Sequence, residues 1–83
     1  MLEYSDLEKT ILRKMLFDTR IGGRHLGEQD LFRGFPSHIK GDIPKVIKKL
    51  IKKELILNHP TSYGQQYSLN PQKIQVIKEI LEE

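Results

Sequence analysis

The 83-residue sequence contains no cysteine and no long apolar run. Without cysteine the chain can form neither a disulfide nor a thiolate metal site, and this composition fits a reducing compartment. No apolar stretch approaches the length of a signal-peptide core or of a membrane-spanning helix, so we expect a cytoplasmic protein without a membrane anchor. The length suits one domain with a thin hydrophobic core, and we expect a single domain over residues 1–83.

The sequence also lacks the residue groupings that metal sites and catalytic centres require. Its histidines, His25, His38 and His59, are far apart and form no HxH or HxxxH pair. Ser37 and His38 are adjacent, but neighbours in a chain rarely face each other, and no third group is placed to orient the histidine. We therefore expect no metal, no cofactor and no enzymatic activity.

Positive charge is the feature that stands out, with a formal net charge of +3 and a pI near 9.3. It is concentrated in residues 42–53, DIPKVIKKLIKK, which we expect to form a helix that begins at residue 41 or 42. Asp42 suits the N-cap position and Pro44 suits the first turn. Helical spacing places one set of residues on a buried face, Ile43, Val46, Ile47, Leu50 and Ile51, and another on the opposite face, Lys45, Lys48, Lys49 and Lys52.

This lysine face has two interpretations. Lysines on a solvated helix often serve only solubility, but such faces usually mix charges of both signs. Here residues 40–53 contain six lysines and a single acid, Asp42, and no glutamate is placed to pair with a lysine one turn away. We interpret the segment as a nucleic-acid recognition helix, and the solvated surface remains the alternative.

The remaining elements are predicted from caps, periodicity and turn residues. Ser5 and Glu8 form an S-x-x-E capping box, which starts a helix at Asp6 that runs to about Phe17. Further along the chain we expect an irregular connection at 20–25 and a short helix at 28–33 that is ended by Gly34. We then expect strands at 55–57 and 67–69, joined by a polar loop, and a last helix from 70 to 81. The link at 35–41 should expose Ser37, His38 and Lys40.

The order of these elements resembles the winged helix-turn-helix family. LIKKELIL at 50–57 is similar to the passage from a recognition helix into the first wing strand, with Glu54 where that family usually has glycine. YSLNP at 67–71 is similar to the segment that closes the wing and opens the last helix. IGGRH at 21–25 and PTSYGQQYSLNP at 60–71 resemble a group of small archaeal winged-helix proteins whose function is uncharacterised.

The resemblance implies an α+β fold, mostly α, with a three-helix core, a two-stranded antiparallel wing and a C-terminal helix. It also implies double-stranded DNA as the partner, bound in transcription regulation or as a minor chromosomal protein. The DNA-binding residues implied are Ser37, His38, Lys40, Lys45, Lys48, Lys49, Lys52, His59, Ser62, Tyr63 and Gln65, of which the last four would lie at the wing tip. RNA binding and a protein–protein interaction module within a larger assembly are the alternatives.

Three features of the sequence each have two interpretations. Gly22 and Gly23 before Arg24 form either an anion-binding nest or a plain turn. Tyr63 either stacks on a sugar or base or shields its hairpin. The apolar stripe that includes Ile77 in the last helix either covers the core or joins two copies in a homodimer, and the first helix could share that contact.

Overall fold

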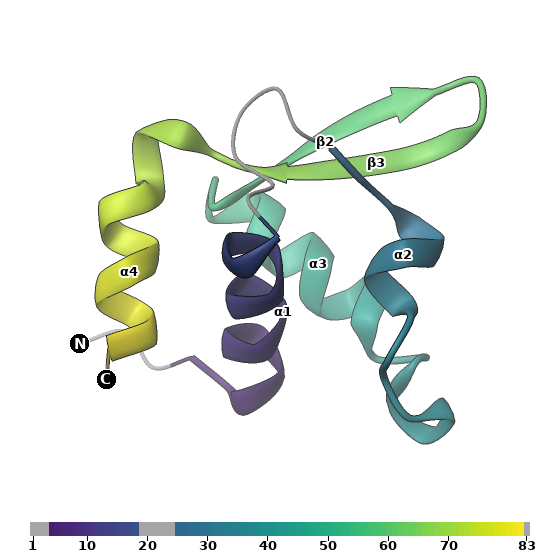
Figure 1. The fold of residues 1–83 in the computed structure, drawn as a ribbon, viewed down its shortest axis with the longest axis horizontal. Helices are drawn as coiled ribbons and strands as arrows, with labels where there is room; N and C mark the ends of the chain where they lie inside the picture. Colours follow the sequence, from purple (N-terminus) through teal and green to yellow (C-terminus); the bar gives the residue numbers. More distant parts are fainter. Residues whose placement is uncertain (1–3, 19–24, 83) are drawn as a thin grey trace.

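The computed structural model describes residues 4–18 and 25–82. Within them lie α1 (Asp6–Phe17), β1 (Leu26–Gly27), α2 (Glu28–Phe32), α3 (Ile43–Lys52), β2 (Ile56–Thr61), β3 (Gly64–Leu69) and α4 (Ile74–Glu82), with short 3-10 turns at Ser37–Ile39 and Pro71–Lys73. The fold is α+β and mostly helical, and its small antiparallel sheet lies across one end of the helices (Figure 1). No helix in the described part of the chain is long and apolar enough to cross a membrane. The segment 22–24, for which an anion-binding nest and a plain turn are the two interpretations, lies outside the described residues.

The predicted capping box starts α1. The Ser5 Oγ accepts a hydrogen bond from the amide of Glu8 at 3.1 Å, and a Glu8 carboxylate oxygen accepts one from the amide of Ser5 at 2.9 Å. Burial acts to raise the pKa of Glu8, but the hydrogen bonds from Ser5 and the charge of Lys53 outweigh burial, so the pKa is lowered. The other oxygen of this carboxylate lies 3.6 Å from the Lys53 Nζ, which also sits 4.3 Å from the centre of the Tyr4 ring. Lys53 therefore ties the start of α1 to the end of α3.

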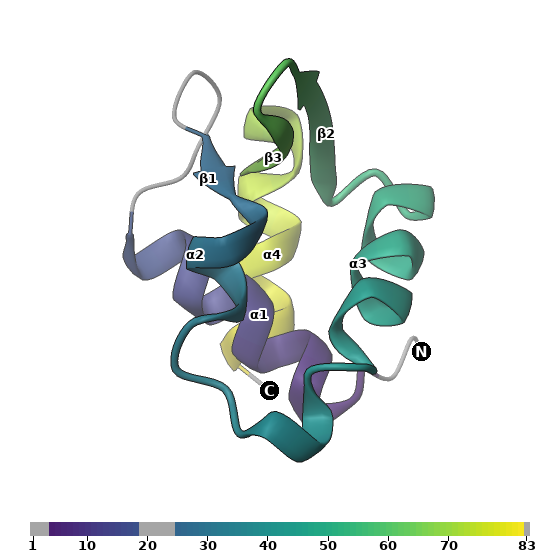
Figure 2. The ribbon, with the colours of Figure 1, turned by 90° about the vertical axis from the view of Figure 1, so that its right-hand side faces the viewer.

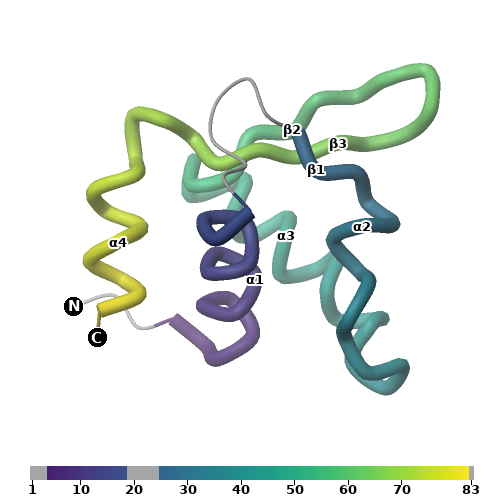
Figure 3. The backbone as a smooth tube through the Cα atoms, in the orientation of Figure 1, coloured from purple at the N-terminus to yellow at the C-terminus, as the bar shows by residue number. Residues whose placement is uncertain are grey.

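Helices α1, α3 and α4 lie beneath the sheet (Figure 3). Their buried apolar residues form one core with those of the sheet. The core contains Ile11, Leu12, Met15, Leu31, Ile43, Ile47, Leu50, Leu55, Ile56, Leu69 and Ile77, all at most 2% exposed. Ile77 is fully buried, so the α4 stripe covers the core of its own domain. The homodimer stays a prediction, but Ile77 itself is not available at the surface for such a contact.

The sheet has three strands, in the order β1-β3-β2, whereas the sequence predicted only the two antiparallel strands of the hairpin. The additional strand, β1, pairs Leu26 with Tyr67 and Gly27 with Gln66. Two residues are too few to show an alternating pattern, so periodicity could not predict this strand. It gains its hydrogen bonds only because the fold brings it beside β3.

Strands β2 and β3 are also longer than predicted, because most of the expected polar loop belongs to them. Pairing continues from Ile56 opposite Leu69 to Thr61 opposite Gly64, which leaves only Ser62 and Tyr63 in the turn. The Thr61 hydroxyl closes this turn, since it accepts a hydrogen bond from the Tyr63 amide at 3.1 Å and donates one to the Gly64 carbonyl at 2.7 Å. Polar composition predicted a loop, whereas backbone pairing forms a hairpin.

The end of α3 shows how the chain passes from the helix into the sheet. The amide of Leu55 bonds to the carbonyl of Leu50 at 3.0 Å, and that of Glu54 bonds to the carbonyl of Ile51 at 2.9 Å, the two bonds of a Schellman motif. This motif needs a left-handed residue, and Glu54 adopts φ 65°. The Asn70 side chain then donates to the Glu54 carbonyl at 2.8 Å, while the Asn70 Oδ1 accepts from the Gln72 amide at 3.0 Å. Asn70 thus bonds to the end of α3 and to the turn before α4.

We expect Glu54→Gly to raise the free energy of unfolding by about 1 kcal/mol, because glycine adopts the left-handed conformation without the Cβ penalty. Urea denaturation of the two proteins at neutral pH measures the difference. Lys53→Gly is the matched control. Lys53 has φ −82°, so glycine there relieves no backbone strain, and the substitution also removes the ion pair with Glu8. Equal stability of Glu54→Gly and the natural protein would contradict the assignment of strain to Glu54.

Candidate nucleic-acid interface

Helix α3 has one buried face and one lysine face, as its periodicity predicts. Ile43, Ile47 and Leu50 are at most 2% exposed. The opposite side carries four exposed lysines, Lys45, Lys48, Lys49 and Lys52. The helix begins at Ile43, with Asp42 at the N-cap position, but the Asp42 side chain makes no capping hydrogen bond because its backbone is already helical (φ −85°, ψ −21°). The helix thus begins one or two residues after the predicted start at 41 or 42, and the predicted cap by the Asp42 side chain is wrong.

The side chains of these four lysines form no hydrogen bond and no ion pair with any other residue in 4–18 or 25–82. Lys53 differs, because Glu8 and Tyr4 hold its ammonium group. Lys45 and Lys52 are about 10 Å apart along the helix axis at 1.5 Å per residue. The lysine face is therefore a compact group of four positive charges without an ion-pair partner among the described residues, although Glu28 shares a cavity with Lys48.

The link before α3 places three further predicted residues at one end of this helix. Ser37 and His38 lie in the 3-10 turn Ser37–Ile39, Lys40 follows it, and all three are exposed. The turn lies at the N-terminal end of α3, and the β2–β3 hairpin lies at the C-terminal end (Figure 2). The lysine face thus runs between the turn and the hairpin.

The hairpin places most, but not all, of its predicted residues near the tip. Ser62 and Tyr63 form the turn, and the Tyr63 side chain is 96% exposed. Gln65 is exposed on β3, one residue beyond Gly64. His59 lies farther from the tip, opposite Gln66, and is half-buried. The prediction that His59 belongs to the wing tip is wrong, because β2 continues past it for two residues.

A cavity of about 320 Å³ separates α3 from the hairpin, and it brings helix and strand residues together. Lys48 and Ile51 line it from α3, whereas Asn58, Gln65 and Tyr67 line it from the strands. Burial raises the pKa of Tyr67, and the negative charge of Glu28 at the same cavity adds to this effect. Sequence reasoning missed Asn58, because it fell in a predicted loop. The alternation of side chains between the two faces of β2 could have identified Asn58, but only if the limits of the strand had been predicted correctly.

The opposite face of the sheet carries a stacked histidine pair. The rings of His25 and His59 lie 3.8 Å apart with an 8° angle between their planes. His59 Nε2 is 2.7 Å from the hydroxyl of Ser68, which is fully buried, and His25 Nδ1 is 3.2 Å from the Gln66 side-chain oxygen. Burial lowers the pKa of His59, and the neighbouring His25 lowers it further. The pair bridges β1 and β2 over β3.

This histidine pair is a packing feature rather than a ligand set. The nitrogen lone pairs of stacked imidazole rings lie in parallel planes and do not converge on one point. Across the described ranges, no three His, Cys, Asp or Glu side chains are grouped closely enough to hold a metal ion. The sequence predicted none of the contacts within the pair, since His25 and His59 are brought together only by the three-stranded sheet.

Comparison with known proteins gives no assignment. No protein-family model, no curated protein and no solved structure matches this chain. Its function is therefore argued from its own residues.

We expect the free energy of unfolding to decrease as the pH falls below 6.5, the ordinary value for histidine, because folding lowers the pKa of His59. The unfolded chain then binds a proton that the folded protein does not, so the contribution is complete above this pH and is lost below it. Urea denaturation at about pH 7.5 and about pH 5.5, on either side of the histidine range, measures the change.

Two glutamine variants test whether His59 is the source of this pH dependence. His59→Gln should reduce the pH dependence, whereas His38→Gln, on the exposed turn, should leave it intact. If both variants keep the full dependence of the natural protein, His59 is not its source.

Proposed function

We propose that this chain is a winged-helix protein that binds double-stranded DNA, either as a transcriptional regulator or as a minor chromosomal protein. The order α1, β1, α2, α3, β2, β3, α4 supports this proposal, as does the pairing of β1 with the second strand of the hairpin. In this arrangement α3 enters the major groove and the β2–β3 hairpin acts as the wing. The proposal needs no metal and no cofactor.

The observation that carries the proposal is the unpaired lysine face of α3. Four exposed ammonium groups within about two helical turns repel one another, and a polyanion relieves this repulsion. Phosphates of a duplex lie close enough together to meet several of these lysines at once, and counterion release then adds to affinity. A face that served only solubility would gain nothing from such clustering.

The side chains on α3 support affinity more than sequence reading. Lysines mainly contact phosphates, which position the duplex without identifying its bases. Side chains that read base edges, such as arginine, asparagine and glutamine, are missing from the lysine face. The nearest such groups are Asn58 and Gln65, which face α3 across the cavity. We therefore infer weak sequence preference in the helix and a larger contribution from the hairpin.

Charge reversal tests the lysine face. Lys48→Glu combined with Lys52→Glu should weaken binding to a random-sequence duplex by more than about tenfold, and each lost phosphate contact should reduce the salt slope by about 0.9. Fluorescence anisotropy titrations at two salt concentrations measure both quantities.

The matched control is Lys73→Glu combined with Lys78→Glu, which makes the same change of net charge at the 3-10 turn before α4 and on α4 itself. This control should lose much less affinity. Equal losses in the two double variants would mean that net charge, rather than the lysine face, governs binding. Unchanged affinity in Lys48→Glu/Lys52→Glu would remove α3 from the interface.

One observation favours the second candidate, a protein-interaction module. Phe17, the last residue of α1, is 87% exposed, and such a large apolar ring is costly to leave in water. A homodimer or a protein partner could cover it. For a homodimer, sedimentation equilibrium should show a mass that rises with concentration, and Phe17→Ser should abolish the rise while DNA binding is retained. A constant monomer mass in both proteins would exclude a homodimer through Phe17.

A further inference from the structure

The Tyr63 side chain lies at the tip of the hairpin and makes no contact that holds the turn. Its ring is 96% exposed, so it does not shield the hairpin. The turn is held instead by the Thr61 hydroxyl, which bonds to the amide of Tyr63 and to the carbonyl of Gly64. A preordered turn that exposes an aromatic ring loses little conformational entropy when a flat ligand stacks on that ring.

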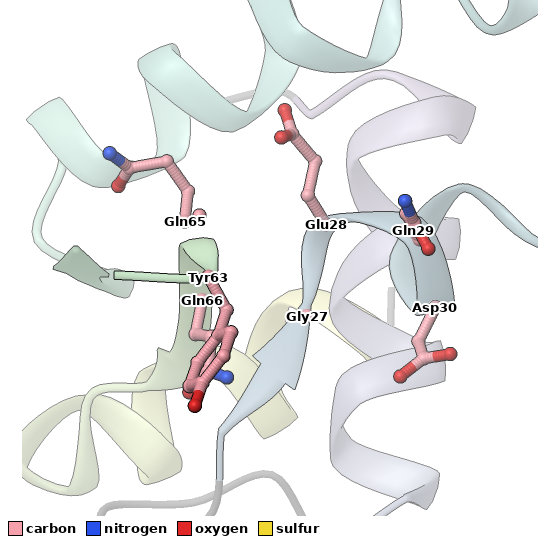
Figure 4. A pocket seen from close by; sticks show the side chains of 8 residues that line it. Gly27, Glu28, Gln29, Asp30, Tyr63, Gln65 and Gln66 are labelled. Carbon is pink, nitrogen blue, oxygen red and sulfur yellow. The ribbon is translucent and has the colours of Figure 1, made fainter. Parts of the chain in front are cut away.

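A polar cavity of about 240 Å³ lies beside this ring (Figure 4). One wall is the hairpin, and the other is the end of β1 with the start of α2. The side chains that line it come from both walls: Glu28, Gln29, Asp30, Tyr63, Gln65 and Gln66. The cavity is open at the edge of β3 because β1 pairs only with Gln66 and Tyr67.

The chemistry of this cavity differs from that of the lysine face. Among the described residues no lysine or arginine lines it, and the carboxylates of Glu28 and Asp30 oppose the entry of a phosphate. The three glutamine amides offer donors and acceptors, although the Gln66 oxygen is already engaged by His25. Carboxylates and amides can accept hydrogen bonds from exocyclic amines. A flat, uncharged, amine-bearing ring suits these walls.

The two cavities adjoin each other. Glu28 and Gln65 line both the polar cavity and the cavity that contains Lys48. Figure 4 shows Gln65 and Glu28 extending away from the Tyr63 ring. The polar cavity is therefore continuous with the surface beside Lys48 along the hairpin edge.

We propose that this second cavity binds a single unpaired nucleobase, stacked on Tyr63 and hydrogen-bonded by Gln29 and Asp30 of the α2 wall. In a continuous duplex the bases are stacked inside the helix and cannot reach it, whereas an unpaired base can leave the stack at small cost. The inference rests on the proposed function, and it specifies the substrate as duplex DNA that contains an unpaired base.

Two duplexes of identical flanking sequence test the proposal, one fully paired and one with a single bulged adenine. The natural protein should bind the bulged duplex about 5- to 150-fold more tightly, the range given by stacking one base on an aromatic side chain. Tyr63→Ala should bring the ratio of the two affinities to about one, because the bulged base then has no ring to stack on. Tyr63→Phe retains the ring and should retain most of the excess.

A fluorescent base shows whether the additional affinity for the bulged duplex arises at Tyr63. With 2-aminopurine in place of the bulged adenine, the natural protein and Tyr63→Phe should change its emission on binding, and Tyr63→Ala should change it far less. A bulged thymine has no exocyclic amine and should gain less affinity than adenine. An equal gain for thymine would overturn the role given to the Asp30 carboxylate.

The outcomes separate this inference from the proposed function. Equal affinity of the natural protein for paired and bulged duplexes, or an excess that survives in Tyr63→Ala, would overturn the unpaired-base site and leave duplex binding in place. Lys48→Glu/Lys52→Glu should weaken binding to both duplexes by a similar factor. Failure of the natural protein to bind either duplex would overturn both proposals.

Discussion

The packing of the apolar face of α3 against α1 and the sheet is the constraint on which the other features depend. Ile43, Ile47 and Leu50 are almost fully buried, and each contributes roughly 1.5–3 kcal/mol of burial free energy. Because these residues cannot turn outward without a loss of that size, the lysines between them cannot turn inward. The same interaction that stabilises the core therefore holds four positive charges in a fixed pattern on the surface.

Two different chemistries then lie on neighbouring surfaces. The lysine face has charge but few groups that could distinguish one base from another. The cavity at the hairpin edge has the reverse composition, with amides, carboxylates and an aromatic ring. In the proposed function the first supplies affinity that decreases with salt, and the second supplies selection for DNA structure. Separation of the two tasks allows each to vary without loss of the other.

Local signals in the sequence predicted the helices well and the sheet poorly. The capping box set the start of α1, and the spacing of apolar residues identified both faces of α3, because these patterns depend on residues only three or four positions apart. The pairing of β1 with β3 and the His25–His59 stack join residues more than thirty positions apart, which only the fold brings together. The length of the hairpin depends on backbone pairing between β2 and β3, which the local pattern of residues did not predict. The site divides in the same way, since the lysines were predicted, whereas the cavity residue Asn58 was missed and His59 was misplaced.

Asn70 joins two ends of the fold. Its side chain holds the last carbonyl of the turn after α3 and caps the turn that leads into α4, and its own amide bonds to the carbonyl of Leu55 at 3.0 Å. The direction in which α3 ends is thus mechanically coupled to the direction in which α4 begins. Replacement of this one residue would therefore release the end of α3 and the start of α4 together, although the two helices are separate along the chain.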